Sequence, residues 1–117
     1  MDARQPLGRA GEEAAARLFR RQGFTVLDRN WRCCLGELDL VARRGGLLVF
    51  CEVKTRRSSS YGEPFEAVGP RKQARLRRLA GRWLADHRCG ARHVRFDVVS
   101  VLAGGSTPRV THLVDAF

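Results

Sequence analysis

Apolar residues recur with the spacing of an α-helix in two stretches of the chain. Ala15, Leu18 and Phe19 share one face of a helix predicted over residues 10–22. A second helix is predicted over residues 70–87, where a proline suits the first turn and leucines form the apolar face. Both patterns are amphipathic, so each helix is expected to pack one face against a sheet.

Between and after these helices the pattern is that of β-strands. The predicted strands cover residues 24–30, 36–42, 47–54, 93–102 and 109–114. Residues 47–51 are apolar at every position, which is typical of a buried central strand. Residues 55–69 contain serines, glycines and a proline, which predicts a mobile loop. The order α-β-β-β-α-β-β, without an internal repeat, predicts one α/β domain over residues 1–117 with helices flanking a central sheet.

The charge balance of the chain indicates what kind of partner it binds. Lys and Arg number 22 against 12 Asp and Glu, which gives a formal net charge of +10. Only Lys54 and Lys72 are lysines, and the guanidinium groups of the arginines suit bidentate contacts with phosphate. We therefore expect a polyanionic partner, with nucleic acid favoured over an anionic membrane surface.

Length and apolar content exclude several classes of protein. A chain of 117 residues has no room for a second catalytic domain. No stretch approaches the roughly 18 consecutive apolar residues of a membrane span, and the first residues lack the apolar run of a signal peptide. The four cysteines form no CxxC pair, which fits reduced thiols. We expect a cytoplasmic protein that does not contact membranes.

Basic side chains form a stripe on the second predicted helix. Four arginines follow one another at i, i+4, i+7 and i+11, with no acidic partner expected four residues away. We expect this stripe and the basic residues near it to contact the phosphate backbone of a nucleic acid. The predicted contacts are Arg56, Arg57, Arg71, Lys72, Arg75, Arg78 and Arg82.

Acidic residues alternate with leucines in the strand predicted over residues 36–42. Since strand side chains alternate between the two faces of a sheet, Glu37 and Asp39 are expected on one face and Leu38 and Leu40 on the other. The following strand is apolar until its charged end. If the two strands pair as a hairpin, an acidic residue of each can meet at the same place in the sheet.

That meeting point has the residue types needed for phosphodiester hydrolysis. Glu52 and Lys54 share a strand face, and Asp39 is expected to converge with Glu52. Two carboxylates can bind a hard divalent cation such as Mg²⁺ or Mn²⁺, while the ammonium orients the attacking water and offsets negative charge in the transition state. Glu12 lies beside the apolar stripe of its helix and could add a further carboxylate.

The same residues also permit a structural interpretation. Glu52 and Lys54 could form an ordinary ion pair at a strand end, with Asp39 accepting hydrogen bonds in a turn. The chain would then be a non-catalytic module that binds DNA or RNA, because a basic surface needs no active site to bind phosphates. A third class, a protein-interaction scaffold, would need an exposed apolar patch, and the sequence offers no clear one.

The chain resembles the YraN family, small bacterial proteins related to archaeal Holliday junction resolvases and placed in the restriction-endonuclease-like PD-(D/E)xK nuclease superfamily. The segments that carry this resemblance are GRAGEEAAARLF, GELDLVARR, LLVFCEVKTRR, GPRKQARLRRLAGRWL, RFDVV and the terminal AF. They cover almost the entire chain in order. The resemblance implies a three-layer core around a mixed β-sheet and a nuclease activity.

The resemblance also implies roles for individual residues. It places an acidic site residue at Glu12, a metal-binding aspartate at Asp39 and the E-x-K pair at Glu52 and Lys54, and it suggests Gln73 as an additional residue on the site side. The superfamily's proline before the aspartate is replaced here by leucine. The sequence thus predicts a metal-dependent endonuclease for structured or branched DNA, and two symmetrical incisions of a junction would call for a homodimer.

Overall fold

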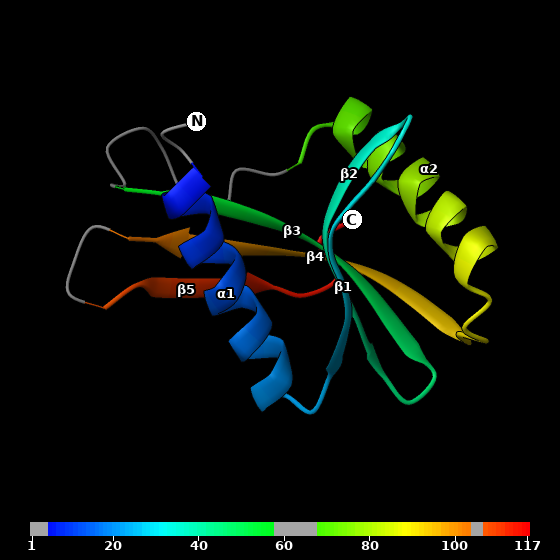
Figure 1. Cartoon of the computed structure of the whole chain (residues 1–117), viewed down its shortest axis with the longest axis horizontal. Helices are drawn as coiled ribbons and strands as arrows, with labels where there is room; N and C mark the ends of the chain where they lie inside the picture. The colour runs from blue at the N-terminus through cyan, green and yellow to red at the C-terminus, as the bar shows by residue number, and fades with distance from the viewer. Residues whose placement is uncertain (1–4, 58–67, 104–106) are drawn as a thin grey trace.

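A five-stranded mixed sheet forms the centre of the fold in the computed structural model, which describes residues 5–57, 68–103 and 107–117 (Figure 1). The strands lie side by side in the order of the chain, β1-β2-β3-β4-β5. β3 and β4 are parallel, and the other neighbours are antiparallel. The strands are β1 (Thr25–Cys33), β2 (Gly36–Arg44), β3 (Leu47–Arg56), β4 (His93–Leu102) and β5 (Arg109–Leu113).

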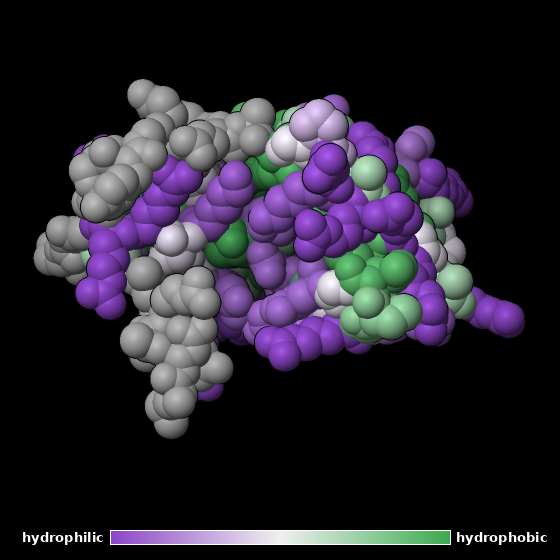
Figure 2. All heavy atoms as spheres, turned by 90° about the horizontal axis from the view of Figure 1, so that it is seen from above, coloured by the Kyte–Doolittle hydropathy of each residue, from purple (hydrophilic) through white to green (hydrophobic). Residues whose placement is uncertain are grey.

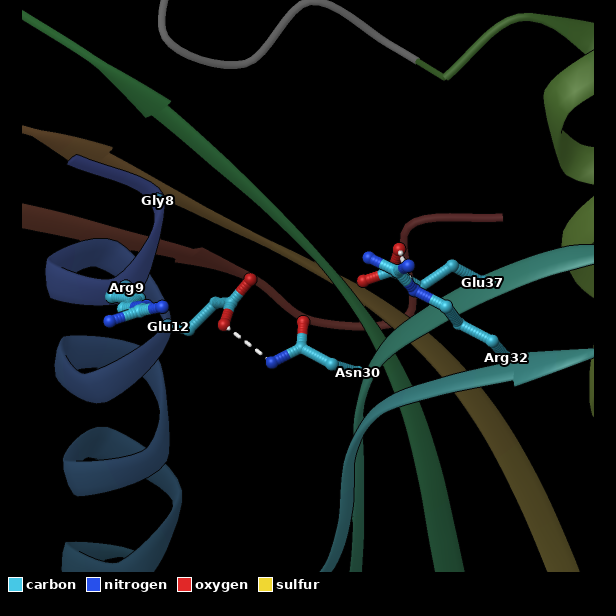
Figure 3. A pocket seen from close by; sticks show the side chains of 6 residues that line it. All are labelled: Gly8, Arg9, Glu12, Asn30, Arg32 and Glu37. Atoms are coloured by element: carbon cyan, nitrogen blue, oxygen red, sulfur yellow. Dashed lines mark hydrogen bonds and ion pairs between the residues drawn. The ribbon is translucent and has the colours of Figure 1, made fainter. Parts of the chain in front are cut away.

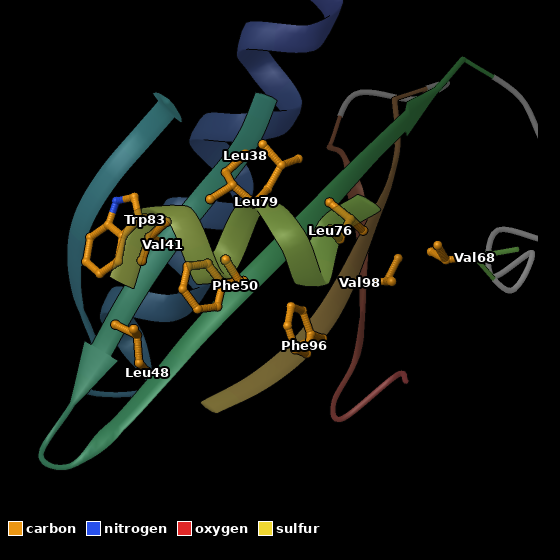
Figure 4. Close-up of a cluster of buried hydrophobic side chains, with 11 residues drawn as sticks. Leu38, Val41, Leu48, Phe50, Val68, Leu76, Leu79, Trp83, Phe96 and Val98 are labelled. Atoms are coloured by element: carbon orange, nitrogen blue, oxygen red, sulfur yellow. The ribbon is translucent and has the colours of Figure 1, made fainter. Parts of the chain in front are cut away.

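The two helices cover opposite faces of this sheet. α1 (Gln5–Arg21) packs Phe19 into a buried cluster that includes Val49 of β3. α2 (Pro70–His87) packs Leu79 and Trp83 into a second cluster that includes Phe50 (Figure 4). Successive residues of β3 therefore face different helices, as the doubly apolar pattern of this strand predicted. The predicted element order and the mixed sheet between two helix layers are confirmed.

Several element boundaries differ from the predicted ones. α1 begins at Gln5, five residues before the predicted start, and β1 continues to Cys33, where it pairs with Gly36 in a tight hairpin. Gly36 has φ 136°, a backbone conformation that side chains rarely permit. β3 continues to Arg56 because its parallel ladder with β4 extends that far. The remainder of the predicted loop, residues 58–67, lies outside the described residues.

The sheet divides between β2 and β3, and this division positions the site. Their ladder runs from the pair Arg44 and Leu47 to the pair Leu40 and Cys51. Beyond it, β2 stays paired with β1 and β3 stays paired with β4, so the two halves diverge like a fork (Figure 1). Leu38 consequently packs in the α2 cluster while Leu40 packs in the α1 cluster. Leu38 and Leu40, which were expected to share a face, thus pack in different clusters, although the pairing of β2 with β1 is regular from Leu38 to Leu40.

α1 approaches β3 unusually closely at Gly11. A Cβ atom at this position would overlap Thr55 Oγ1 and would lie 3.1 Å from Thr55 Cβ. Gly11 is buried, so the missing side chain allows the helix backbone to rest against the strand. This contact brings the next residue of the helix, Glu12, toward the fork.

A buried carboxylate ties the C-terminal end of the chain to β4. Asp97 is completely buried and accepts two hydrogen bonds from the Arg95 guanidinium, at 2.8 and 2.9 Å. His112 Nε2 lies 2.7 Å from the same carboxylate, and the Asp115 N–H donates to it at 3.0 Å. Burial raises the pKa of Asp97, but the hydrogen bonds from His112 and Arg95 outweigh it, and the pKa lies below its usual value.

The described residues contain no helix that is both long enough and apolar enough to cross a membrane. All four cysteines lie in the described part of the chain, and their thiols are free. Cys51 is buried in the α1 cluster, where it packs as a small apolar side chain.

Candidate active site

Asp39 lies at the point where β2 and β3 separate. Its carboxylate accepts a hydrogen bond of 2.8 Å from the backbone N–H of Val53. The side chain thus satisfies a strand donor just past the last paired residues of the ladder, Leu40 and Cys51. The two strands pair as the antiparallel hairpin that was expected, and Asp39 meets β3 just beyond its last pair, where the charge of Glu52 acts on it.

Three carboxylates gather at this fork from two elements. Oxygen atoms of Glu12, Glu37 and Asp39 all lie within 4.8 Å of one another. Asn30 Nδ2 donates to Glu12 at 2.8 Å, and Arg32 Nε donates to Glu37 at 3.2 Å. In Figure 3, Glu12 and Glu37 point toward each other from α1 and β2. Glu37 was expected on the face of Asp39 but was not among the predicted site residues.

The pKa of Asp39 rises from 3.8 to about 7 in this environment. Burial is the largest cause, and the negative charge of Glu52 is the next; Glu12 and Glu37 add smaller repulsions, while the Val53 hydrogen bond acts in the opposite direction. A carboxylate surrounded in this way binds a proton near neutral pH unless another cation takes the proton's place. Such a strongly perturbed group is typical of a functional site.

Glu52 approaches the same region from β3 and pairs with a lysine of α2. Lys72 Nζ lies 2.5 Å from Glu52 Oε1, and the Glu52 side chain is only 11% exposed. Lys54 follows two residues later and is half-buried, on the strand face that also carries Phe50 toward α2. Glu52 and Lys54 therefore share a face as predicted, whereas Lys72, which was expected to contact phosphate, contacts the carboxylate of Glu52.

These side chains are chemically suited to a hard cation. Every ligand atom of the Glu12, Glu37 and Asp39 group is a carboxylate oxygen, the donor that Mg²⁺ and Mn²⁺ prefer. A divalent ion would also relieve the repulsion that raises the pKa of Asp39. The donor set thus fits the predicted cation, with Glu37 as a candidate ligand that the sequence analysis missed. The sequence did contain a signal for Glu37, because acidic residues alternate with leucines at the start of β2.

A hollow of about 340 Å³ opens beside the acidic group. It is lined by Gly8, Arg9, Glu12, Asn30, Arg32 and Glu37 (Figure 3). Two of the three clustered carboxylates, Glu12 and Glu37, therefore face open space, with arginine side chains next to them. A charged substrate could reach the carboxylates through this hollow.

The arginine stripe of α2 is exposed along the helix. Arg71, Arg75 and Arg78 are exposed, and this stripe begins beside Lys72, the lysine that reaches Glu52. Arg82 is also exposed but pairs with Asp86 at 3.3 Å, so the expectation that the stripe has no acidic partner was wrong. The i, i+4 spacing of that pair was visible in the sequence.

The three remaining residues of the predicted site and interface differ in exposure. Arg57 is exposed just after β3, whereas Gln73 is half-buried and donates to the Val68 carbonyl at 2.7 Å. Arg56, the last residue of β3, is half-buried. Figure 2, which views the molecule from above, shows hydrophilic residues over most of the described surface on that side.

The acidic fork and the fold around it can be compared with known proteins. Residues 11–101 match the model of the uncharacterised protein family UPF0102. The chain belongs to the UPF0102 family. The resemblance to the YraN family is confirmed by this match.

Relatives within the UPF0102 family match along the full chain. The UPF0102 protein of Frankia casuarinae is 54% identical, covering 100% of both chains. That of Frankia alni is 56% identical, covering 100% of this chain and 98% of its own. That of Arthrobacter sp. (strain FB24) is 54% identical over 97% of each chain. None of these three names states an activity.

Proposed function

We propose that this UPF0102 protein is a metal-dependent endonuclease that hydrolyses phosphodiester bonds in structured or branched DNA. One observation carries the proposal: carboxylate oxygens of Glu12, Glu37 and Asp39 lie within 4.8 Å of one another at a fork that Glu52 also approaches, and the raised pKa of Asp39 agrees with this crowding. Keeping four acidic groups together destabilises a fold, so such a cluster is expected where a cation is to be bound.

Asp39 and Glu52 are the proposed metal ligands, with Glu12 as an auxiliary carboxylate. A divalent cation such as Mg²⁺ or Mn²⁺ would polarise the scissile phosphate and stabilise the charge that develops on it. Lys54 holds the attacking water and offsets negative charge in the transition state, because its ammonium shares the strand face of Glu52. Glu12 is held in place by the hydrogen bond from Asn30.

The substrate is proposed from the charge of the protein. The net charge of +10 and the exposed arginines of α2 favour a phosphate backbone as partner. DNA is proposed on the resemblance to junction resolvases, and a homodimer would supply the second incision that a four-way junction requires. The predicted cytoplasmic location is part of the same proposal.

The cleavage test uses single-stranded, duplex, flap and four-way-junction DNA with Mg²⁺ or Mn²⁺. We expect the wild type to cut at least one of these substrates, and Asp39→Asn with Glu52→Gln to abolish cutting while binding persists. Glu13→Gln is the matched control, since it removes a neighbouring carboxylate that pairs with Arg29 outside the acidic group. Cutting by the double variant at the wild-type rate would contradict the proposed ligands.

The surface test measures affinity for the preferred DNA as a function of salt. Arg75→Ala with Arg78→Ala should weaken binding and reduce the slope of log K against log salt by about one per lost phosphate contact. If the slope of log K against log salt is unchanged, α2 does not contact the DNA.

The ion pair between Lys72 and Glu52 favours a second candidate, a non-catalytic nucleic-acid-binding module. In that case Glu52 would serve in a structural ion pair instead of binding a metal. If wild type and double variant both bind DNA and neither cuts it with either metal, this second candidate replaces the first.

A further inference from the structure

Both lysines of this arginine-rich chain belong to the neighbourhood of Glu52. The sequence contains 22 basic residues of the Lys and Arg type, and only Lys54 and Lys72 are lysines. Lys54 follows Glu52 by two residues on the same face of β3, and Lys72 reaches it from α2 at 2.5 Å. Elsewhere in the chain each such positive charge is a guanidinium. The position beside Glu52 is therefore one where an ammonium is used instead.

An ammonium and a guanidinium hold a carboxylate differently. Arginine can bind both oxygens of a carboxylate in a fixed, planar geometry, whereas lysine is a compact charge on a flexible stem. Lys72 contacts one oxygen, Oε1, of Glu52. A contact of this kind is more easily given up to a competing cation than a bidentate one.

Exposure shows which partner of this ion pair can move. The side chain of Lys72 is 45% exposed, but that of Glu52 is only 11% exposed. Lys72 is already partly hydrated, so its ammonium can move into solvent at little cost in free energy. The Glu52 carboxylate stays buried and needs a cation beside it. Arg71 and Arg75 lie on the same first turns of α2, so a released Lys72 joins a surface that is already basic.

We propose that Lys72 and the divalent cation compete for Glu52, and that the displaced ammonium then contacts a phosphate of the substrate. This inference rests on the proposed function, because it requires a cation at Glu52. It makes metal binding and nucleic-acid binding mutually reinforcing, since each favours the state in which Lys72 has left the carboxylate.

The decisive measurement is the affinity of the full chain for Mn²⁺ by calorimetry, after removal of metals with EDTA. Lys72→Gln should bind Mn²⁺ about fivefold more tightly than the wild type, because the competitor is gone. Arg71→Gln is the matched control; it removes one positive charge from the neighbouring position, and screening limits its effect to less than about twofold. Equal affinities of these two variants, or weaker binding by Lys72→Gln, would overturn the proposal.

Lys72→Arg distinguishes the effect of the positive charge at position 72 from the effect of how easily the side chain leaves Glu52. It keeps the positive charge and can hold Glu52 with two hydrogen bonds, so its Mn²⁺ affinity should be no higher than that of the wild type. Tighter binding by Lys72→Arg would contradict the competition. Thermal melting by circular dichroism verifies that each variant is folded, and the exposed position of Lys72 makes this outcome expected.

A DNA-binding readout tests the second half of the proposal. A fluorescent four-way junction is titrated with and without Ca²⁺, and the cation should strengthen binding to the wild type more than to Lys72→Gln. Equal strengthening would overturn the transfer to phosphate. If neither wild type nor Lys72→Gln binds Mn²⁺, the metal site of the proposed function fails as well. If the wild type binds Mn²⁺ and Lys72→Gln behaves like Arg71→Gln, only the role of Lys72 fails.

Discussion

Asp39→Asn should make the protein more stable near pH 8, although it removes a proposed metal ligand. The pKa of Asp39 lies at about 7, compared with 3.8 for an ordinary aspartate, because of burial and the charge of Glu52. Each unit of pKa corresponds to about 1.4 kcal/mol, so the full difference would be about 4 kcal/mol. Asp39 is half-buried, and screening by solvent reduces this figure, so we expect a gain of about 2 kcal/mol in the free energy of unfolding.

The direction of the pH dependence follows from the raised pKa. Below about pH 4 the carboxyl group is protonated in both the folded and the unfolded state, and it contributes no difference. Between that pH and about 7 the unfolded chain releases the proton while the folded protein keeps it, so folding becomes less favourable as pH rises. Above about 7 the penalty is complete. The advantage of Asp39→Asn should therefore be less than about half as large near pH 5 as near pH 8.

The measurement is urea unfolding of wild type and Asp39→Asn at both pH values, in EDTA so that no metal compensates the charge. The asparagine keeps a side-chain oxygen that can accept the Val53 N–H, so the substitution preserves the strand contact. A gain of about 2 kcal/mol corresponds to a rise of about 8 °C in Tm. Glu13→Gln is the control, because the hydrogen bond and charge of Arg29 lower the pKa of that exposed carboxylate and its loss should not stabilise the fold.

Two results would refute this reasoning about Asp39. One is an Asp39→Asn variant that is no more stable than the wild type near pH 8. The other is a gain of equal size at both pH values, which would trace the effect to packing rather than to charge. The expected result would identify a residue that costs stability and whose retention therefore needs a functional reason.

Two further predictions concern the parts of the fold that hold the site in place. Gly11→Ala should lower the free energy of unfolding by about 2 kcal/mol, because its Cβ would overlap Thr55. Adding Thr55→Gly should restore much of this loss in the double variant. If urea unfolding shows no recovery in the double variant, the contact between Gly11 and Thr55 is contradicted. Asp97→Asn should cost about 2 kcal/mol near pH 7, because it leaves the half-buried Arg95 guanidinium without its charged partner at a completely buried position. Since the pKa of Asp97 is lowered, this difference should shrink as pH falls below about 4, and a loss independent of pH would indicate a packing effect.

The local pattern of the sequence was sufficient to predict the elements and the layers. The helical spacing of Ala15 and Phe19 and the doubly apolar run of β3 predicted two helices on opposite sides of a central sheet, which the structure confirms. The same periodicity placed Glu52 and Lys54 on one strand face. These inferences succeed because helix and strand periods depend only on neighbouring residues.

The composition of the site was decided by the tertiary structure. Strict alternation put Leu38 and Leu40 on one face, but in the structure they pack in different clusters, and the end of the β2–β3 ladder leaves Asp39 at the fork. The cluster with Glu37 and the pairing of Lys72 with Glu52 also depend on elements far apart in the chain. Such contacts follow from how far strands stay paired and how a helix crosses them, and a one-dimensional pattern of polar and apolar residues does not record either.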